Sequence, residues 1–146
     1  MKRIVTTNNE KGRSCILIEE EVGPHSHIWE ALPGLPLGRD PVPAGHELVF
    51  PRGGLQVRSV ELPPDAVLED YIRQGLPGHD ERGFHRTGTL DVIVLLEGRL
   101  KLILDEGETE LSPGDVVVQR DTRHAWRAVS APARFLSVIY RPEELG

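Results

Sequence analysis

Two segments of the sequence carry side chains that could do chemistry. The first, GFHRTGTLDVIVLLEG at 83–98, places His85 before a turn and Asp91 at the start of an alternating apolar run. The second, SPGDVVVQRDTRHAW at 112–126, ends its own apolar run shortly before His124. Imidazole and carboxylate groups bind divalent metals and also transfer protons. The two segments therefore indicate the two halves of one site, with or without a metal.

The spacing of His85 and Asp91 requires a turn between them. On a straight strand, which rises roughly 3.3 Å per residue, they would lie about 20 Å apart and could not share an ion. The RTGT stretch after His85 is turn-like because it contains Gly88. We therefore expect the chain to reverse here and to bring Asp91 back beside His85.

The elements around these segments are short and mostly extended. The 146 residues include 12 prolines and 15 glycines, which separate short apolar or alternating segments, as in proteins built of many short strands. Only DAVLEDYIRQG at 65–75 has a helical pattern. The pattern predicts an all-β fold, an antiparallel jelly-roll barrel of two sheets with one short helix at most. The expected strands are 2–6, 14–20, 27–32, 46–50, 54–62, 89–97, 99–104, 115–119, 124–129 and 133–140.

Alternation along 91–97 separates two faces of a strand. Val92, Val94 and Leu96 share one face, and Asp91 begins the other. We expect the face with Asp91 to point inward, where an unpaired carboxylate would be costly, so a site residue is favoured over a turn cap. The segment EGRLKLIL is expected to return after Gly98 as the second strand of a hairpin.

Length and composition predict a single domain, residues 1–146, without a nucleic-acid or membrane partner. The 23 acidic and 17 basic residues give a net charge of -6, and the arginines are scattered, so a phosphate backbone would be repelled. No run approaches the roughly 20 apolar residues of a membrane span, and the N-terminus lacks the apolar region of a signal peptide. The lone Cys15 lies in an apolar run, where we expect a buried thiol in a reducing, cytoplasmic setting.

The two segments resemble the motifs of the cupin superfamily, small jelly-roll barrels whose two motifs surround a metal or substrate site. The first motif typically has two histidines separated by one residue, then a glutamate and a glycine. His85, Thr87, Asp91 and Gly98 stand at those positions, so the first metal motif is degenerate. The match covers roughly residues 78–140, the expected cupin core, and strands within 1–77 would pack on this core or extend it.

The second cupin motif is also matched with departures. Gly114 and His124 fit its glycine and its histidine. Gln119 and Asp121 stand where the family usually has proline and glycine, and Ala128 stands where it has asparagine. The resemblance is therefore specific for the fold and leaves the chemistry of the site open.

The resemblance implies a metal site of His85, Asp91 and His124. Thr87 replaces the second histidine, and a hydroxyl is a far weaker ligand than imidazole. Two histidines and one carboxylate suit non-haem iron(II) with open positions for oxygen and substrate, and nickel, manganese or zinc could use the same ligands. The alternative is a metal-free site in which Asp91 and His124 act as an acid–base pair. In either case we expect the three side chains to converge at one end of the barrel interior.

Several functions stay open at this point. One is a metal-dependent enzyme, an oxygenase or related, acting on a small organic molecule; another is a metal-free isomerase, dehydratase-type lyase or cyclase of a carbonyl or polyketide-like substrate. A third is a binding protein that holds such a ligand without converting it.

Other polar and aromatic residues lie in or near the two motifs. Arg86, Gln119 and Arg127 could supply polar contacts to a ligand. His79, in the polar loop PGHDERG, is expected to be solvated, and Trp126 is expected in the core. The N-terminal strands lack obvious partners within the cupin core, which predicts a homodimer that covers their edges.

Overall fold

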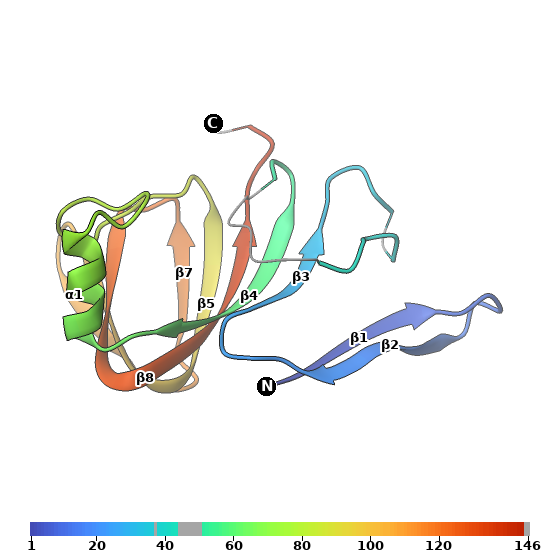
Figure 1. Cartoon of the computed structure of the whole chain (residues 1–146). Coiled ribbons are helices and arrows are strands. Elements are labelled where there is room, and N and C mark those ends of the chain that lie inside the picture. The colour runs from blue at the N-terminus through green and yellow to red at the C-terminus, as the bar shows by residue number, and fades with distance from the viewer. Residues whose placement is uncertain (37, 44–50, 145–146) are drawn as a thin grey trace.

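The computed structural model describes residues 1–36, 38–43 and 51–144. Strands make up most of its regular structure and there is one short helix, which confirms the all-β prediction (Figure 1). The expected strand at 46–50 lies outside the described residues. The elements are β1 (Lys2–Asn8), β2 (Ser14–Glu21), β3 (Ser26–Ala31), β4 (Leu55–Leu62), α1 (Asp65–Arg73), β5 (Leu90–Leu104), β6 (Glu108–Leu111), β7 (Val116–Arg120) and β8 (His124–Tyr140).

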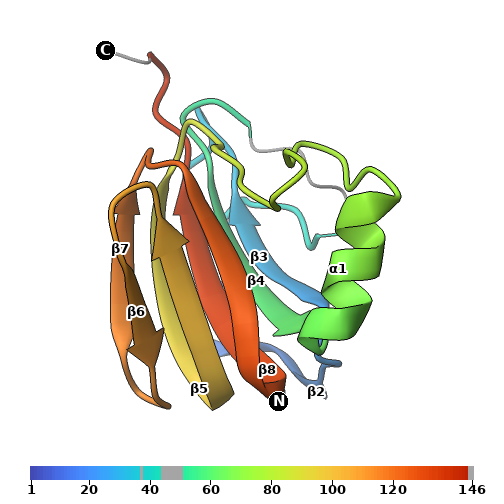
Figure 2. The ribbon, with the colours of Figure 1, turned by 90° about the vertical axis from the view of Figure 1, so that its left-hand side faces the viewer.

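Two long strands, β5 and β8, build the barrel. They pair antiparallel from Leu90 opposite Tyr140 to Leu104 opposite His124. The first half of β5 also pairs with β7, and its second half pairs with β6. The second half of β8 pairs with β4, which pairs with β3. Hydrogen bonding therefore joins the strands from β3 to β8 into one six-stranded sheet, which curls into the jelly-roll barrel that Figure 2 shows from the side of β6 and β7.

The predicted hairpin at Gly98 is wrong, because β5 continues through this residue. Register shifts against β8 surround it, and the strand bends there. Gly98 has a φ of 79°, and a Cβ built on it would lie 2.3 Å from the carbonyl oxygen of Pro132 in β8. Glycine is needed because the two strands bend against each other at this point. The segments predicted as separate strands at 124–129 and 133–140 likewise form one strand.

The barrel interior has an apolar end and a polar end. Trp126 belongs to the apolar core, as expected. The other core residues are Ile93, Leu95, Leu100, Leu102, Leu111, Ala128, Ala133 and Phe135. At the polar end, register aligns Gln56, Ile139, Asp91 and Gln119 in one row across β4, β8, β5 and β7. The three polar members of this row are buried, so this end of the interior positions groups that can bind or react.

Helix α1 begins after Pro64 and has Gln74 as its C-cap, close to the predicted 65–75. It buries Leu68 and Ile72. A Cβ on Gly83 would lie 2.6 Å from Cδ1 of Ile72, so the helix packs closely on the segment that leads to His85. No helix in the described part of the chain is long and apolar enough to cross a membrane.

Strands β1 and β2 form a separate two-stranded sheet, which we call the arm. Figure 1 shows it extending away from the barrel. Arg3 fastens its base, donating a hydrogen bond of 3.1 Å to the carbonyl oxygen of Ile28. Cys15 is exposed on the arm, which corrects the expectation of a buried thiol: the apolar run around it covers no core.

Candidate active site

His85 and His124 lie side by side at the polar end of the interior. Their backbones form an isolated antiparallel bridge, with His85 N 2.9 Å from His124 O and His124 N 3.0 Å from His85 O. Their ring centroids are 4.2 Å apart. The bridge ties the segment before β5 to the first residue of β8, so the turn between His85 and β5 is held in place at both ends.

Asp91 points into the barrel from the second residue of β5. Its residue is 8 % exposed, and the charge on its carboxylate acts on the pKa of His124. Thr89 forms a side-chain hydrogen bond with Asp91, and the Thr89 hydroxyl lies 2.5 Å from that of Thr87. Thr87, at the position of the missing histidine, is thus part of a hydroxyl chain that ends on the carboxyl group.

Burial biases all three groups toward their neutral forms. Desolvation, reinforced by the neighbouring His124 and His79, lowers the pKa of His85 from 6.5 to about 3. Desolvation also lowers the pKa of His124, against the opposing effects of the Thr122 carbonyl and Asp91. The pKa of Asp91 is raised by burial, and the hydrogen bond from Thr89 offsets part of the rise. The site therefore favours neutral imidazoles beside a carboxyl group that holds its proton more tightly than usual.

Hydrogen bonding fixes the tautomer of His124. Its Nδ1 lies 2.8 Å from the carbonyl oxygen of Thr122. Because a carbonyl only accepts, Nδ1 carries the hydrogen and Nε2 is left with a lone pair when the ring is neutral. This lone pair can accept a proton or bind a metal.

Several buried polar atoms near these residues have no hydrogen-bond partner within the described part of the chain. They are Nδ1 of His85, Oδ1 of Asp91, and both amide atoms of Gln119. Asp91 and Gln119 are direct neighbours in the register of β5 and β7. Such groups are costly to bury unsatisfied, so this end of the interior is a candidate site for a polar ligand.

A divalent metal fits these donors in kind, and their present arrangement does not form a site for it. Two imidazoles and a carboxylate, two of them with unpaired ligand atoms, are suitable ligands. However, within residues 1–36, 38–43 and 51–144, no three histidine, cysteine, aspartate or glutamate side chains are arranged to hold one ion. A metal would require side chains of the set to reorient.

His79 belongs to the cluster, contrary to the expectation that it is a solvated loop residue. Its ring centroid is 4.2 Å from that of His85, and its charge acts on the pKa of both His85 and His124. Its Nδ1 lies 2.9 Å from the carbonyl oxygen of Pro77. The sequence held one signal for this position, a polar loop just before the first motif, and that signal does not distinguish a loop over the site from one in solvent.

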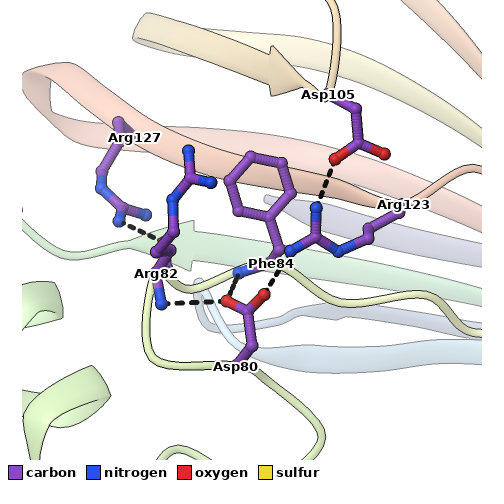
Figure 3. A network of polar contacts seen from close by, with 6 residues as sticks. All are labelled: Asp80, Arg82, Phe84, Asp105, Arg123 and Arg127. Carbon is purple, nitrogen blue, oxygen red and sulfur yellow. Dashed lines mark hydrogen bonds and ion pairs between the residues drawn. The ribbon is translucent and has the colours of Figure 1, made fainter.

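Arg123 clamps the loop that carries His79 (Figure 3). Oδ1 of Asp80 accepts the backbone N–H groups of Arg82 and Phe84, each at 2.9 Å. The other Asp80 oxygen pairs with Arg123, which also pairs with Asp105 in the turn after β5. The Arg123 guanidinium lies 4.3 Å from the centroid of the Phe84 ring. The hydrogen bond from Phe84 is the main cause that lowers the pKa of Asp80, so its carboxylate stays charged and the clamp stays closed.

Arg123→Gln should loosen this loop without unfolding the barrel. Exposed ion pairs contribute little to global stability. The Arg123 side chain, however, joins Asp80 of this loop to Asp105 in the turn after β5. Hydrogen exchange should accelerate at residues 79–85 and stay unchanged in the β5–β8 pairing. The matched control is Arg99→Gln, which breaks the exposed pair with Glu110 and should leave 79–85 as protected as in the wild type. Equal exchange there in both variants would contradict the clamp.

The three polar residues that the sequence left unplaced have separate roles. Gln119 faces the interior and is 3 % exposed. Arg86 is exposed and donates from Nε to Asp121 at 2.9 Å. Arg127 supports the loop before His85, donating to the carbonyl oxygen of Arg82 at 3.0 Å (Figure 3). Only Gln119 therefore lies with the histidines and Asp91.

Asp121 explains one departure from the second motif. Its φ is 54°, in the left-handed region that favours glycine, the residue the family usually has here. Aspartate tolerates this conformation better than most residues, and its side chain accepts the N–H of Gly88 at 3.0 Å. The Asp121 side chain thus links the turn after β7 to the turn before β5, and it holds both turns around the site.

These features define a jelly-roll barrel whose polar interior end is lined by histidines and a carboxyl group. A family model described as "Cupin domain" matches residues 73–139. A "cupin-domain-containing oxidoreductase" of Aspergillus ruber is 31% identical over 152 residues, which cover 94% of this chain and 70% of that protein. The chain belongs to the cupin family.

Other relatives come from fungi as well. The "oryzines biosynthesis cluster protein J" of Aspergillus oryzae is 30% identical over 148 residues, covering 94% of this chain and 79% of that protein. The "phomopsin biosynthesis cluster protein C'" of Diaporthe leptostromiformis is 45% identical over 69 residues, covering 47% of this chain and 35% of that protein. Among solved structures, a cupin-2 domain protein from Shewanella frigidimarina gives a TM-score of 0.44 at 17% identity, covering 60% of this chain and 71% of that one.

Proposed function

We propose that this cupin is an enzyme that acts on a small organic molecule, with Asp91 and His124 as its acid–base pair. The observation that carries the proposal is the set of buried polar atoms on His85, Asp91 and Gln119 that have no partner among the described residues. A polar ligand would satisfy them, and an apolar one would not. The names of the fungal relatives, which place them in biosynthetic clusters, support a small organic substrate.

The two groups are suited to move a proton along a carbonyl compound. Nε2 of His124 takes a proton from the carbon next to the carbonyl group, and the protonated Asp91 gives its proton to the carbonyl oxygen. The C–H bond breaks as an O–H bond forms, and the product is an enol. Return of a proton at another carbon completes an isomerisation, and loss of a neighbouring hydroxyl as water completes a dehydration.

The pKa directions support these roles. A raised pKa keeps Asp91 protonated at a higher pH than an ordinary carboxyl group, so that it can donate. A lowered pKa keeps His124 neutral at a lower pH than usual, so that it can accept. Gln119, beside Asp91, has both an amide donor and an amide acceptor free to orient the carbonyl group.

A deuterium wash-in experiment tests the proposal. Protein dialysed against EDTA is mixed in D2O with a panel of small β-dicarbonyl and hydroxy-ketone compounds, and NMR follows loss of the proton next to the carbonyl. Wild-type protein should accelerate exchange for at least one compound, and Asp91→Asn and His124→Gln should each lower the rate by about 100-fold or more. His25→Gln, at an exposed residue, is the control and should match the wild type. Exchange that survives both site variants would contradict the proposal.

A metal-dependent enzyme, an oxygenase or related, is the second candidate. Two observations favour it: several relatives are named oxidoreductases, and unpaired ligand atoms lie on His85 and Asp91. His85, Asp91 and His124 would hold iron, nickel, manganese or zinc after reorienting. The metal would supply a Lewis acid or a site for oxygen.

Elemental analysis separates the two candidates. Protein purified without an affinity tag would contain an equimolar metal if the second candidate holds, and His124→Ala would lose it while keeping the far-UV circular dichroism spectrum. Absence of metal in both proteins, together with active wash-in, would support the acid–base enzyme. Ligand binding without wash-in and without metal would instead identify a binding protein.

We further propose that the protein works as a homodimer of single-domain subunits in a reducing, cytoplasmic setting. The exposed, unpaired Cys15 supports a reducing compartment. The net charge of -6 argues against a nucleic-acid partner.

A further inference from the structure

Arg58 carries a charge on the inner face of β4. It is 9% exposed, and among the described residues it is the one arginine or lysine that is buried. Register places it opposite Ser137 of β8, which lies opposite Ile93 of β5. This inward row is next to the row that contains Gln56 and Asp91. A buried charge is costly unless other groups pair with it, so packing of the barrel alone does not account for a guanidinium here.

Glu30 of β3 balances part of this charge. Burial lowers the pKa of Arg58, and the negative charge of Glu30 raises it, so the two groups lie close enough to interact. Gln56 holds Glu30 in place, because its Nε2 donates a hydrogen bond of 2.7 Å to Oε1 of Glu30. A guanidinium presents five N–H donors in a planar fork, and one carboxylate accepts two of them side by side. Arg58 therefore has donors enough to bind a second carboxylate in addition to Glu30.

His27 of β3 lies beside Arg58. The two residues are register partners across β3 and β4, so their side chains leave the sheet on the same face. Nε2 of His27 is buried and has no hydrogen-bond partner within the described part of the chain. A carboxylate that binds Arg58 can accept a hydrogen from this nitrogen. Arginine and histidine together therefore offer the donors that an anionic group requires.

A small molecule can span the distance from Arg58 to the acid–base pair. Strand β8 separates β4 from β5, and neighbouring strands lie about 4.8 Å apart. Neighbouring residues on one face of a strand lie about 6.8 Å apart, so an ideal sheet separates Cα of Arg58 from Cα of Asp91 by about 12 Å. Both side chains point into the barrel and shorten this distance. A ligand of a few carbon atoms can then contact both groups.

We infer that Arg58, assisted by His27, binds the carboxylate of the substrate, which is a small oxo acid whose carbonyl group lies at Asp91 and His124. The inference rests on the proposed acid–base function and names its substrate class. A bidentate pair between Arg58 and the substrate carboxylate would fix the position of the carbon that loses its proton.

Matched acids and esters test the inference. The probes are pyruvate, acetoacetate and 4-oxopentanoate, in which the carbonyl and carboxyl groups stand progressively further apart, and the methyl ester of each. Titration calorimetry on EDTA-dialysed protein should show at least one acid binding about 10-fold or more tightly than its ester. Arg58→Gln should lower the affinity for that acid by about 100-fold and remove the preference. Arg58→Lys keeps the charge without the fork and should give an intermediate affinity.

Arg134→Gln is the matched control. It breaks the 2.9 Å ion pair with Glu61, which joins the neighbouring strands β4 and β8, and it should keep the wild-type preference for the acid. A wild type that binds none of the acids, or that binds acids and esters alike, would overturn the inference. If Arg58→Gln does not fold, His27→Gln decides: it should lower the affinity for the acid by about 10-fold, and an unchanged affinity would overturn the inference.

Deuterium wash-in with the same probes separates this inference from the proposed function. Wash-in that does not distinguish acids from esters would support the acid–base enzyme and overturn the carboxylate site. A binding preference that Arg58→Gln removes, in a protein without wash-in, would support the carboxylate site and contradict the acid–base enzyme.

Discussion

Gly98→Ala is expected to lower the free energy of unfolding by about 2–5 kcal/mol, the sum of left-handed backbone strain and overpacking. Gly98 has a φ of 79°, and an added Cβ would lie 2.3 Å from the carbonyl oxygen of Pro132 and 3.0 Å from Cα of Ala133. Both atoms belong to the backbone of β8, so no side-chain rotation can relieve the contact. The bend would have to open, and β5 and β8 carry most of the strand pairing of the barrel.

The control for this substitution is Gly107→Ala. Gly107 also has a positive φ, 96°, but no atom lies within 4 Å of an added Cβ. Backbone strain is thus shared by the two variants, and contact with β8 occurs in only one. Urea unfolding at a fixed protein concentration should show the larger loss for Gly98→Ala by at least about 1 kcal/mol. Equal losses of unfolding free energy in the two variants would mean that the bend at Gly98 tolerates a methyl group.

The bend at Gly98 also shows where sequence reasoning stops. Alternating apolar residues identified the strands on both sides of it, because the period of a strand is a local property. A glycine between two such segments is equally consistent with a tight turn and with a bend in one continuous strand. The choice depends on Pro132, which is distant in the sequence and lies against Gly98 in the fold.

The candidate site was predictable only where its residues form local motifs. His85, Asp91 and His124 follow from the two cupin-like segments, and Asp91 is on the inward face as expected. His79 was missed because the position of its loop is set by Arg123, far along the chain. No spacing within the loop encodes that contact.

The interior face of β4 was missed for a different reason. Gln56 and Arg58 alternate with Val57, and a polar–apolar alternation normally places the polar residues in solvent. Here both polar residues are buried, and the valine faces outward in a row with other valines. The alternation of polar and apolar residues separates the two faces of a strand, but it does not determine which face points into the barrel. That choice depends on what lies inside the barrel, where Gln56 shares a row with Asp91 and Gln119 of the candidate site.

The dependence of stability on pH should reveal the buried histidine and the buried carboxyl group as opposing contributions. In the unfolded chain His85 takes up a proton near its ordinary pKa of 6.5, whereas in the folded protein it does so only near pH about 3. Its contribution to stability is therefore fully present above pH 6.5 and is lost as the pH falls toward 3. The lowered pKa of His124 acts in the same direction.

Asp91 acts in the opposite sense, because burial raises its pKa above the ordinary 3.8. The folded state then holds the proton more tightly than the unfolded state, so this contribution is present below pH 3.8 and is lost as the pH rises through the raised value. His85→Gln should therefore flatten the loss of stability between pH 6.5 and 3, and Asp91→Asn should steepen it above pH 3.8. Urea unfolding of EDTA-treated protein at a series of pH values measures both slopes, with His25→Gln expected to follow the wild type. The account of the site would be contradicted if both variants shifted the slope of stability against pH in the same direction. A base and an acid that burial holds neutral change stability with pH in opposite directions.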